Sequence, residues 1–473
     1  MKKKIKYALI SLYDKSNLNL ILKTLKKYNI KIISSGGTSK EIKRIGFSCI
    51  DVSKFTQSSE ILSGRVKTLH PKIHAGILSK RDSKIHKKEL KKNNYEEIDL
   101  VIVNFYPFEK VLKKSNNHKQ IIENIDIGGP TLVRSAAKNY KDVTVVTNPN
   151  QYKNLIKEII KNKGSTSISY REKLSIEAFN QTAYYESIIS NYFNKKSNNL
   201  FPQKKIICGN LIENLRYGEN PHQKAAIYSF EKNLGISKLH GKQLSYNNYN
   251  DIFSALSVSN TFPDNIGTVI VKHSNPCGIS INKNKVKSYK EAYACDPISA
   301  FGGIVSCNYK VTNKVAIELN KLFFEVIVGI GFTKDALKIL KKKKNLRIID
   351  STKLKFKNSY NITSNFNSFL VQESDNKIFK KSDFKIVSKK KPTSKIFDSL
   401  IFSFNACRSI KSNAIVITKN KTTIGIGSGQ PSRLDSCKIA INKMNKFQKL
   451  NTNEQIIAAS DAFFPFVDGL EIL

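Results

Sequence analysis

Residues 269–278 read VIVKHSNPCG, and this stretch is the starting point for the fold. Its three opening residues are apolar and β-branched, which is typical of a buried strand. The strand is expected to end at Lys272 and His273, because Pro276 and Gly278 favour a turn. A cation and a titrating imidazole would then lie at the carboxyl end of a strand, where open α/β sheets bind ligands. A solvated lysine beside a structural histidine also fits the pattern, so the stretch alone does not establish a site.

The first third of the chain alternates between strand and helix patterns. Apolar runs at residues 7–11, 32–33, 100–103 and 143–146 predict strands separated by helices. This alternation predicts a parallel sheet whose connecting loops meet at one edge. The loop SSGGT at residues 34–38 opens a helix, so its backbone N–H groups are suited to bind an anion together with Lys15.

Several other segments are rich in chemically active side chains. In the first third these are SGRVKTLHP at residues 63–71 and IDIGGP at residues 125–130; the former also fits a solvated loop. A polar stretch with Pro202, at residues 194–205, predicts a domain boundary. Beyond it lie LRYGENPHQ (215–223), GKQLSYNN (241–248), DPISAFGG (296–303) and GIGSGQPSR (425–433). Residues 332–347 are expected to form an exposed helix ending in four lysines.

Composition excludes several classes of protein. The 473 residues include 80 Lys and Arg against 37 Asp and Glu, a formal net charge of +43. The basic residues are spread along the chain and are not clustered with aromatics, so no dedicated nucleic-acid site is expected. The seven cysteines lack C-x-x-C or Cys/His spacings that suit zinc, and Pro71 separates His70 from His74, which predicts reduced thiols and no metal. Without a signal peptide or membrane span, the protein is expected to be cytoplasmic.

These motifs, in this order, resemble the bifunctional AICAR transformylase/IMP cyclohydrolase family of purine biosynthesis. The resemblance covers about residues 7–469 and implies an α/β protein of two domains. The first, residues 1–195, would be a parallel-sheet domain like methylglyoxal synthase and would cyclise FAICAR to IMP. The second, residues 203–473, would contain two α/β subdomains like cytidine deaminase. It would transfer the formyl group of 10-formyltetrahydrofolate to AICAR.

The resemblance also implies roles for individual residues. For ring closure, the family's catalytic positions correspond to Lys67, Tyr106, Asp126 and Lys138, and its substrate-binding positions to Ser11, Lys15, Ser35, Gly37, Thr38, Arg65, Thr68 and Asn104. For formyl transfer, His273 would move the proton and Lys272 would support it electrostatically. The substrate-binding positions there correspond to Arg216, Tyr217, Asn247, Asp296, Asn413, Gln430, Arg433 and Phe463. The resemblance implies folate as co-substrate, no metal, and a homodimer with its transformylase sites at the interface.

The chain departs from the family pattern in places. Ser59 stands where the family has Pro, and Val467 stands where it has Arg. The family's closing turn, helix and strand have no counterpart after Leu473, so an edge of the transformylase site is expected to be missing. Two alternatives therefore stay open: a cyclohydrolase with a degenerate second half, and a basic nucleic-acid-binding protein.

Overall fold

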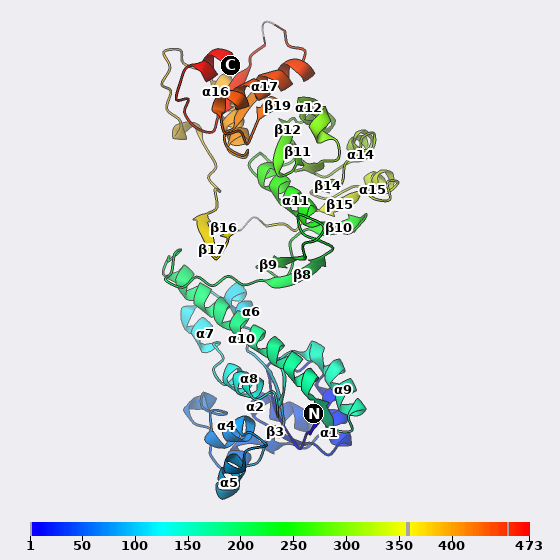
Figure 1. Cartoon of the computed structure of the whole chain (residues 1–473), viewed down its shortest axis with the longest axis vertical. Coiled ribbons are helices and arrows are strands. Elements are labelled where there is room, and N and C mark those ends of the chain that lie inside the picture. The colour runs from blue at the N-terminus through cyan, green and yellow to red at the C-terminus, as the bar shows by residue number, and fades with distance from the viewer. Residues whose placement is uncertain (1, 356–359, 452–453) are drawn as a thin grey trace. The chain divides into compact units, whose positions relative to one another are not determined.

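The computed structural model describes residues 2–355, 360–451 and 454–473. The chain divides into two compact units, residues 1–208 and residues 209–473. In Figure 1 the first unit is coloured blue to green and the second green to red. Each unit has its own sheet and its own hydrophobic core.

The first unit is an α/β domain. Its strands are β1 (Lys2–Lys4), β2 (Tyr7–Leu12), β3 (Lys31–Ser34), β4 (Ile50–Asp51), β5 (Leu100–Asn104), β6 (Thr144–Val146) and β7 (Ser165–Ser167). Its helices are α1 (Leu18–Lys27), α2 (Gly36–Arg44), α3 (Val52–Thr56), α4 (Pro71–Leu78), α5 (Lys84–Lys92), α6 (Phe108–Lys114), α7 (His118–Glu123), α8 (Gly128–Lys138), α9 (Tyr152–Lys161) and α10 (Ile168–Lys196). Five strands form a parallel sheet in the order β4-β3-β2-β5-β6, and β1 pairs with β7. The predicted parallel sheet is confirmed.

The core of this sheet explains why its strands read as unbroken apolar runs. Leu9 on β2 and Val101 on β5 are fully buried, as are Leu22 of α1 and Val133 of α8. Strands of a parallel sheet are covered on both faces by crossover helices, so both sides of each strand must be apolar. Polar residues are left for the strand ends, where the loops meet.

The second unit is a larger α/β domain. Its strands are β8 (Asn210–Leu215), β9 (Ala225–Ser229), β10 (Ser237–His240), β11 (Gly267–Lys272), β12 (Asn275–Ile281), β13 (Ile304–Cys307), β14 (Val326–Gly329), β15 (Arg347–Asp350), β16 (Tyr360–Asn365), β17 (Ser368–Glu373), β18 (Ile415–Lys419), β19 (Thr422–Gly427) and β20 (Ile457–Ser460). Its helices are α11 (Tyr246–Ser259), α12 (Lys285–Cys295), α13 (Pro297–Ala300), α14 (Asn313–Asn320), α15 (Lys334–Leu340), α16 (Ser394–Cys407), α17 (Arg433–Phe447) and α18 (Asp468–Ile472). Nine strands form one mixed sheet, in the order β10-β15-β14-β13-β11-β12-β19-β18-β20.

Strand β11 lies at the centre of that sheet and is buried on both faces. Val269 and Val271 belong to the cluster that includes Ile252 of α11, whereas Ile270 belongs to the cluster that includes Tyr289 of α12. Complete burial of each such side chain stabilises the fold by roughly 1.5–3 kcal/mol. Figure 1 shows α11 and α12 beside this part of the sheet. The apolar run thus reflects two packed faces.

The structure corrects the prediction for the turn after this strand. Strands β11 and β12 form an antiparallel hairpin in which Lys272 pairs with Asn275, and β11 is also antiparallel to β13. Pro276 does not make the turn but lies inside β12, where a register irregularity accommodates its missing N–H. Gly278 is required for close packing, because a Cβ there would lie 1.9 Å from the carbonyl oxygen of Ala292 on α12.

The prediction of a helix over residues 332–347 is also wrong at its end. Helix α15 stops at Leu340, and Arg347 begins strand β15 with only 8% of its surface exposed. The lysines that follow α15 occupy a turn. The run of lysines therefore favoured a longer helix and gave no indication of the short buried strand of four residues that follows.

Candidate active sites

The amino-terminal end of α2 forms a cationic cradle in the first unit. Ser35 precedes the helix, and its side chain does not cap the free N–H groups of the first turn. Gly36 has φ +52°, and a Cβ there would lie 2.6 Å from Nζ of Lys67. A Cβ on Gly37 would lie 3.9 Å from Nζ of Lys15. Two ammonium groups and an uncapped helix start are suited to a phosphate.

Two of the predicted substrate-binding residues also hold the loop that carries Lys15; their binding of substrate stays a prediction. Thr38 is buried, and its Oγ1 accepts from the backbone N of Leu12 at 2.9 Å. The Oδ1 of Asn104 accepts from the backbone N atoms of Tyr13 and Asp14 at 2.8 and 2.9 Å. Ser11 is half-buried on β2, beside this loop. Thr38 and Asn104 therefore position the cradle.

The segment between α3 and α4 contributes further polar groups. Lys67 forms an ion pair with Glu60, 2.7 Å between Nζ and Oε1. Arg65 is exposed and forms an ion pair with Glu123. Thr68 is buried, and its Oγ1 would lie 2.8 Å from a Cβ on residue 128, so the start of α8 approaches this segment closely. The structure thus brings this segment to the first turns of α2 and α8.

Asp126 and Tyr106 place a half-buried acid beside a phenol at the start of α8. Oδ1 of Asp126 accepts from the backbone N of Gly129 at 2.8 Å, and Oδ2 accepts from the backbone N of Tyr106 at 3.3 Å. Burial raises the pKa of Asp126 above its ordinary value. Burial, and then the charge of Asp126, raise the pKa of Tyr106. A carboxyl group whose pKa is raised in this way is suited to proton transfer.

Tyr185 is a site residue that the sequence motifs did not indicate. Its hydroxyl accepts from the backbone N of Asp126 at 2.8 Å, although 59 residues separate the two. Burial raises the pKa of Tyr185 to about 12, so the group stays a neutral phenol. Its position in α10, far from the motif, explains why the motif did not reveal it.

Lys138 is not brought together with these residues. It is exposed at the last position of α8, whereas Asp126 and Gly129 lie at the start. At 1.5 Å per residue, the 11 residues of the helix span about 15 Å. A catalytic role for Lys138 stays a prediction.

In the second unit, several segments with predicted catalytic or binding residues meet at one edge of the nine-stranded sheet, where strands begin or end. Val271 on β11 pairs with Ile304 on β13. Ile304 pairs with Val326 on β14, and Val326 with Arg347 on β15. The end of β11 and the starts of three neighbouring strands therefore lie at the same edge.

The other half of the sheet continues this edge. Strands β12 and β19 are antiparallel, so the start of one lies beside the end of the other. Gly427 ends β19 and pairs with Ile415, which starts β18 and pairs in turn with Ser460 at the end of β20. Neighbouring strands are about 4.8 Å apart, so β11 and β18 are separated by roughly 14 Å. The end of β11, the start of β12, the end of β19, the start of β18 and the end of β20 thus lie on one edge.

Lys272 and His273 are located at the centre of this edge. His273 and Ser274 form the two-residue turn of the hairpin, with φ of 52° and 59°. The Nζ of Lys272 donates to the backbone carbonyl of Phe301 at 2.8 Å. His273 is exposed. A fixed cation therefore lies next in sequence to an accessible imidazole.

A second group of predicted substrate-binding residues, Arg216, Tyr217 and Asn247, lies near a hollow of about 400 Å³. The hollow is lined by Gly218, Glu219, Gln223, Lys224, Ala225 and Tyr246. The guanidinium of Arg216 lies over the ring of Tyr217 at 5.6 Å, and Nδ2 of Asn247 donates to the carbonyl of Glu219 at 3.4 Å. These contacts connect the motif at residues 215–223 with the start of α11.

Arg347 is a further residue that the sequence did not indicate. Its Nε donates to the carbonyl of Gln243 at 3.1 Å, and Nη1 lies 3.5 Å from Oε2 of Glu325. Burial lowers the pKa of Arg347. The positive charge of Arg216 lowers it further, whereas the negative charge of Glu325 raises it. The guanidinium groups of Arg347 and Arg216 thus lie close enough to influence each other.

The remaining predicted residues have structural contacts of their own. Arg433 forms an ion pair with Asp461 and donates to Oδ1 of Asn413 at 2.7 Å. Asn413 donates to the carbonyl of Gln430 at 3.0 Å, so these three predicted residues form one cluster. Phe463 follows it and is 82% exposed.

Asp296 is a buried structural carboxylate. It is 3% exposed, caps α13 through the backbone N of Ser299, and pairs with Nζ of Lys443 at 2.7 Å. Burial opposes ionisation, but the hydrogen bonds and charge of its partners lower its pKa overall. Oδ1 accepts from the backbone N of Ser299 and Oδ2 faces Lys443, and direct binding of substrate by Asp296 stays a prediction.

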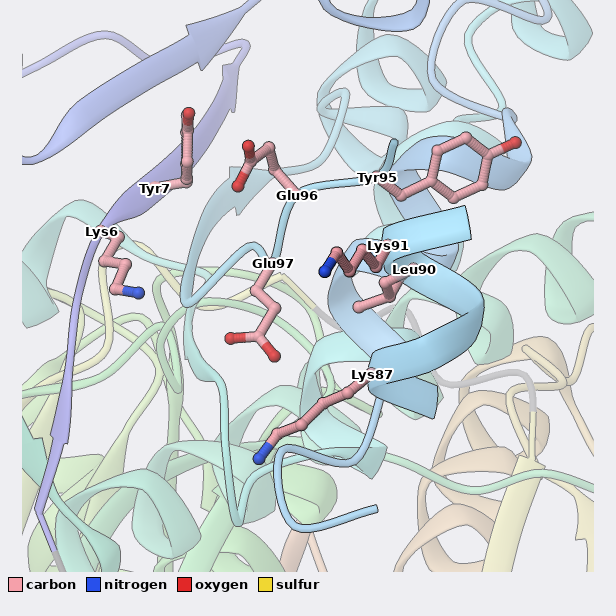
Figure 2. A pocket seen from close by; sticks show the side chains of 8 residues that line it. All are labelled: Lys6, Tyr7, Lys87, Leu90, Lys91, Tyr95, Glu96 and Glu97. Carbon is pink, nitrogen blue, oxygen red and sulfur yellow. The ribbon is translucent and has the colours of Figure 1, made fainter. Parts of the chain in front are cut away.

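Another hollow lies in the first unit, away from the cradle. It has a volume of about 240 Å³ and is lined by Lys6, Tyr7, Lys87, Leu90, Lys91, Tyr95, Glu96 and Glu97. Figure 2 shows Lys87, Leu90 and Lys91 projecting from one helix, with Glu97 between them and Lys6. Tyr7 begins β2, whereas Lys15 follows its other end. The hollow therefore lies at the opposite edge of the parallel sheet.

The described residues form neither a candidate metal site nor a candidate membrane span. In residues 2–355, 360–451 and 454–473, no three His, Cys, Asp or Glu side chains are grouped to hold a metal ion. Over the same ranges, no helix is both long and apolar enough to cross a membrane. The seven cysteines are free thiols.

The chain is similar to known proteins over nearly its whole length. The family described as AICARFT/IMPCHase bienzyme matches residues 136–443, and the MGS-like domain family matches residues 18–131. Proteins named bifunctional purine biosynthesis protein PurH are 45% identical in Prochlorococcus marinus (strain MIT 9301) and 43% identical in Persephonella marina; each comparison covers 98% of this chain and 91% of the relative. The relative of the same name in Acetivibrio thermocellus is 41% identical over 99% of this chain and 91% of its own length. These matches favour the bifunctional interpretation over both alternatives, and the chain belongs to the AICARFT/IMPCHase bienzyme family.

Proposed function

We propose that the two units catalyse consecutive steps: formyl transfer from 10-formyltetrahydrofolate to AICAR, then closure of FAICAR to IMP. The observation that carries the proposal is that each unit presents a separate group of predicted catalytic residues, Lys67 with Asp126 in one and Lys272 with His273 in the other. The proposed domains are residues 1–195 and 203–473, the latter built from two subdomains like cytidine deaminase.

Formyl transfer is assigned to the sheet edge around His273. The exocyclic amine of AICAR attacks the formyl carbon, and the bond from that carbon to N10 of the folate breaks. The amine loses a proton and N10 gains one, so the imidazole of His273, which can both accept and donate a proton, is suited to carry it. The ammonium of Lys272, fixed on the carbonyl of Phe301, would stabilise the developing oxyanion.

Ring closure is assigned to the cradle of the first unit. The carboxamide nitrogen of FAICAR attacks its own formyl carbon, and the former formyl oxygen leaves as water. Holding the two groups together supplies much of the rate, which is the function proposed for the phosphate cradle at Lys15 and α2. Asp126 and Tyr106 would move protons, and Lys67 would stabilise the oxyanion.

Support for the remaining assignments comes from the chain's own chemistry. A net charge of +43 suits anionic ligands such as AICAR and folate. Seven free thiols suit a reducing compartment, and we propose the cytoplasm. We further propose a homodimer with transformylase sites at its interface.

The test is an assay of the purified chain with AICAR and 10-formyltetrahydrofolate. Release of tetrahydrofolate followed by IMP formation is expected. His273→Ala should abolish formyl transfer while ring closure of supplied FAICAR continues, and Lys67→Ala should do the reverse. Equal loss of both activities in either variant would contradict separate sites, and FAICAR closure without tetrahydrofolate release would favour a cyclohydrolase alone.

A further inference from the structure

The turn that carries His273 has a backbone conformation that its residues do not favour. Both His273 and Ser274 have positive φ, at 52° and 59°. Two-residue hairpin turns of this kind prefer Asn-Gly, because residues with a Cβ adopt the left-handed region at a cost. Neither residue here is Asn or Gly. The conformation must therefore be imposed by contacts from elsewhere in the unit.

Asp251 on α11 supplies these contacts. Its Oδ2 accepts from the backbone N of His273 at 3.1 Å, and its Oδ1 accepts from the backbone N of Ser274 at 2.7 Å. Ser254, one turn later on the same helix, donates from Oγ to the carbonyl of Ser274 at 3.1 Å. Asn275 donates from Nδ2 to the carbonyl of His273 at 3.1 Å. Both peptide groups of the turn are thus fixed by side chains.

We propose that Asp251 is a positioning residue for formyl transfer, because its carboxylate fixes the turn and thereby places His273 and Lys272 at the sheet edge. This inference rests on the proposed function of His273. Asp251 does not need to touch the substrate, because it acts through the backbone of the turn. Its two carboxylate oxygens match two adjacent N–H groups, a fit that a single-acceptor side chain cannot reproduce.

The same helix links the turn to the neighbouring group around Arg216. Asn247 lies four residues before Asp251 on α11, a rise of about 6 Å along the axis. The helix is anchored in the core by Ile252 and Ala255, which are fully buried. Helix α11 therefore sets the spacing between Asn247 and the turn. Loss of the half-buried Asp251 side chain leaves that anchor intact, so Asp251→Ala is expected to fold.

The test compares Asp251→Ala, the double variant Asp251→Ala with Ser274→Gly, and Asp335→Asn. Asp335 is a matched control, since its side chain is 71% exposed on α15 in the same unit. We expect Asp251→Ala to lower kcat of formyl transfer about 100-fold, the usual effect of misplacing a reacting group by about 1 Å. The KM for AICAR should stay within about threefold, and ring closure should be unchanged. Glycine at 274 adopts positive φ freely, so the double variant should recover at least about tenfold.

Amide hydrogen exchange supplies a readout that is independent of activity. The amides of His273 and Ser274 should exchange faster in Asp251→Ala and at the wild-type rate in Asp335→Asn. Unchanged exchange, a kcat within about threefold of wild type, or no recovery with Ser274→Gly would each overturn the proposal. If the wild-type chain transfers no formyl group, the proposed function fails instead, and exchange alone decides whether Asp251 holds the turn.

Discussion

Asp126→Asn is expected to slow ring closure while leaving the stability of the first unit nearly unchanged. The substitution removes a carboxylate assigned to proton transfer, a function that contributes about 10²–10⁴-fold. That loss corresponds to about 3–5 kcal/mol of transition-state stabilisation, and it should appear in kcat for ring closure of FAICAR. Formyl transfer should be unaffected, because its residues belong to the other unit.

The stability of this variant should change little, for opposing reasons. Asparagine keeps the acceptor for Gly129 but loses the weaker bond from the N of Tyr106, which costs about 1 kcal/mol. Against this, burial raises the folded-state pKa of Asp126 above its unfolded value. A raised carboxyl pKa means that the folded state loses stability as the pH rises through that interval. Above that interval the wild type bears this cost and the variant does not.

The experiment measures IMP formation from FAICAR and urea unfolding on the same preparations. Asp99→Asn is the control, because burial also raises the pKa of Asp99, but it accepts from the N atoms of Lys6 and Tyr7 at the opposite end of the sheet. That variant should keep kcat within about twofold. The assignment is wrong if Asp126→Asn retains more than a tenth of the wild-type kcat, or if Asp99→Asn loses as much.

Four further outcomes follow from the same contacts. Ring closure should decline as the pH falls through the raised pKa of Asp126, which a pH profile of kcat will show; a flat profile would contradict its use as a base. Lys15→Ala should raise KM for FAICAR about tenfold with little change in kcat, since it removes a phosphate contact, and the effect should shrink at high salt. Tyr185→Phe leaves the N of Asp126 without its partner and should cost about 1–3 kcal/mol in urea unfolding. Gly278→Ala should destabilise the second unit by several kcal/mol, because its Cβ would overlap the carbonyl of Ala292; a Tm unchanged from wild type would refute the packing.

The sequence predicted the parallel sheet because its signals are local. Apolar runs such as those at β2 and β5, and the glycines that open α2, depend on neighbouring residues, and each lies where expected. The hairpin turn was misplaced because Pro276 and Gly278 are strong local turn signals, whereas the actual turn depends on Asp251, 22 residues away. Tyr185 and Arg347 were missed for the same reason: their partners are distant in the chain. Long-range hydrogen bonds leave no pattern in a short window.

The sheet of the second unit explains how such distant motifs can form one site. The register of the strands sets the order of the segments along the edge. Arg347 starts β15, Ile415 starts β18, and Val271 is the last residue but one of β11; the pairing of all three strands is fixed by buried neighbours. A slip of one residue between two of these strands would turn every side chain of one strand to the opposite face. Because both faces are packed against helices, such a slip would bury polar groups and expose apolar ones. The forces that stabilise the core therefore also fix the spacing of about 14 Å between β11, which ends beside His273, and β18, which begins after Asn413.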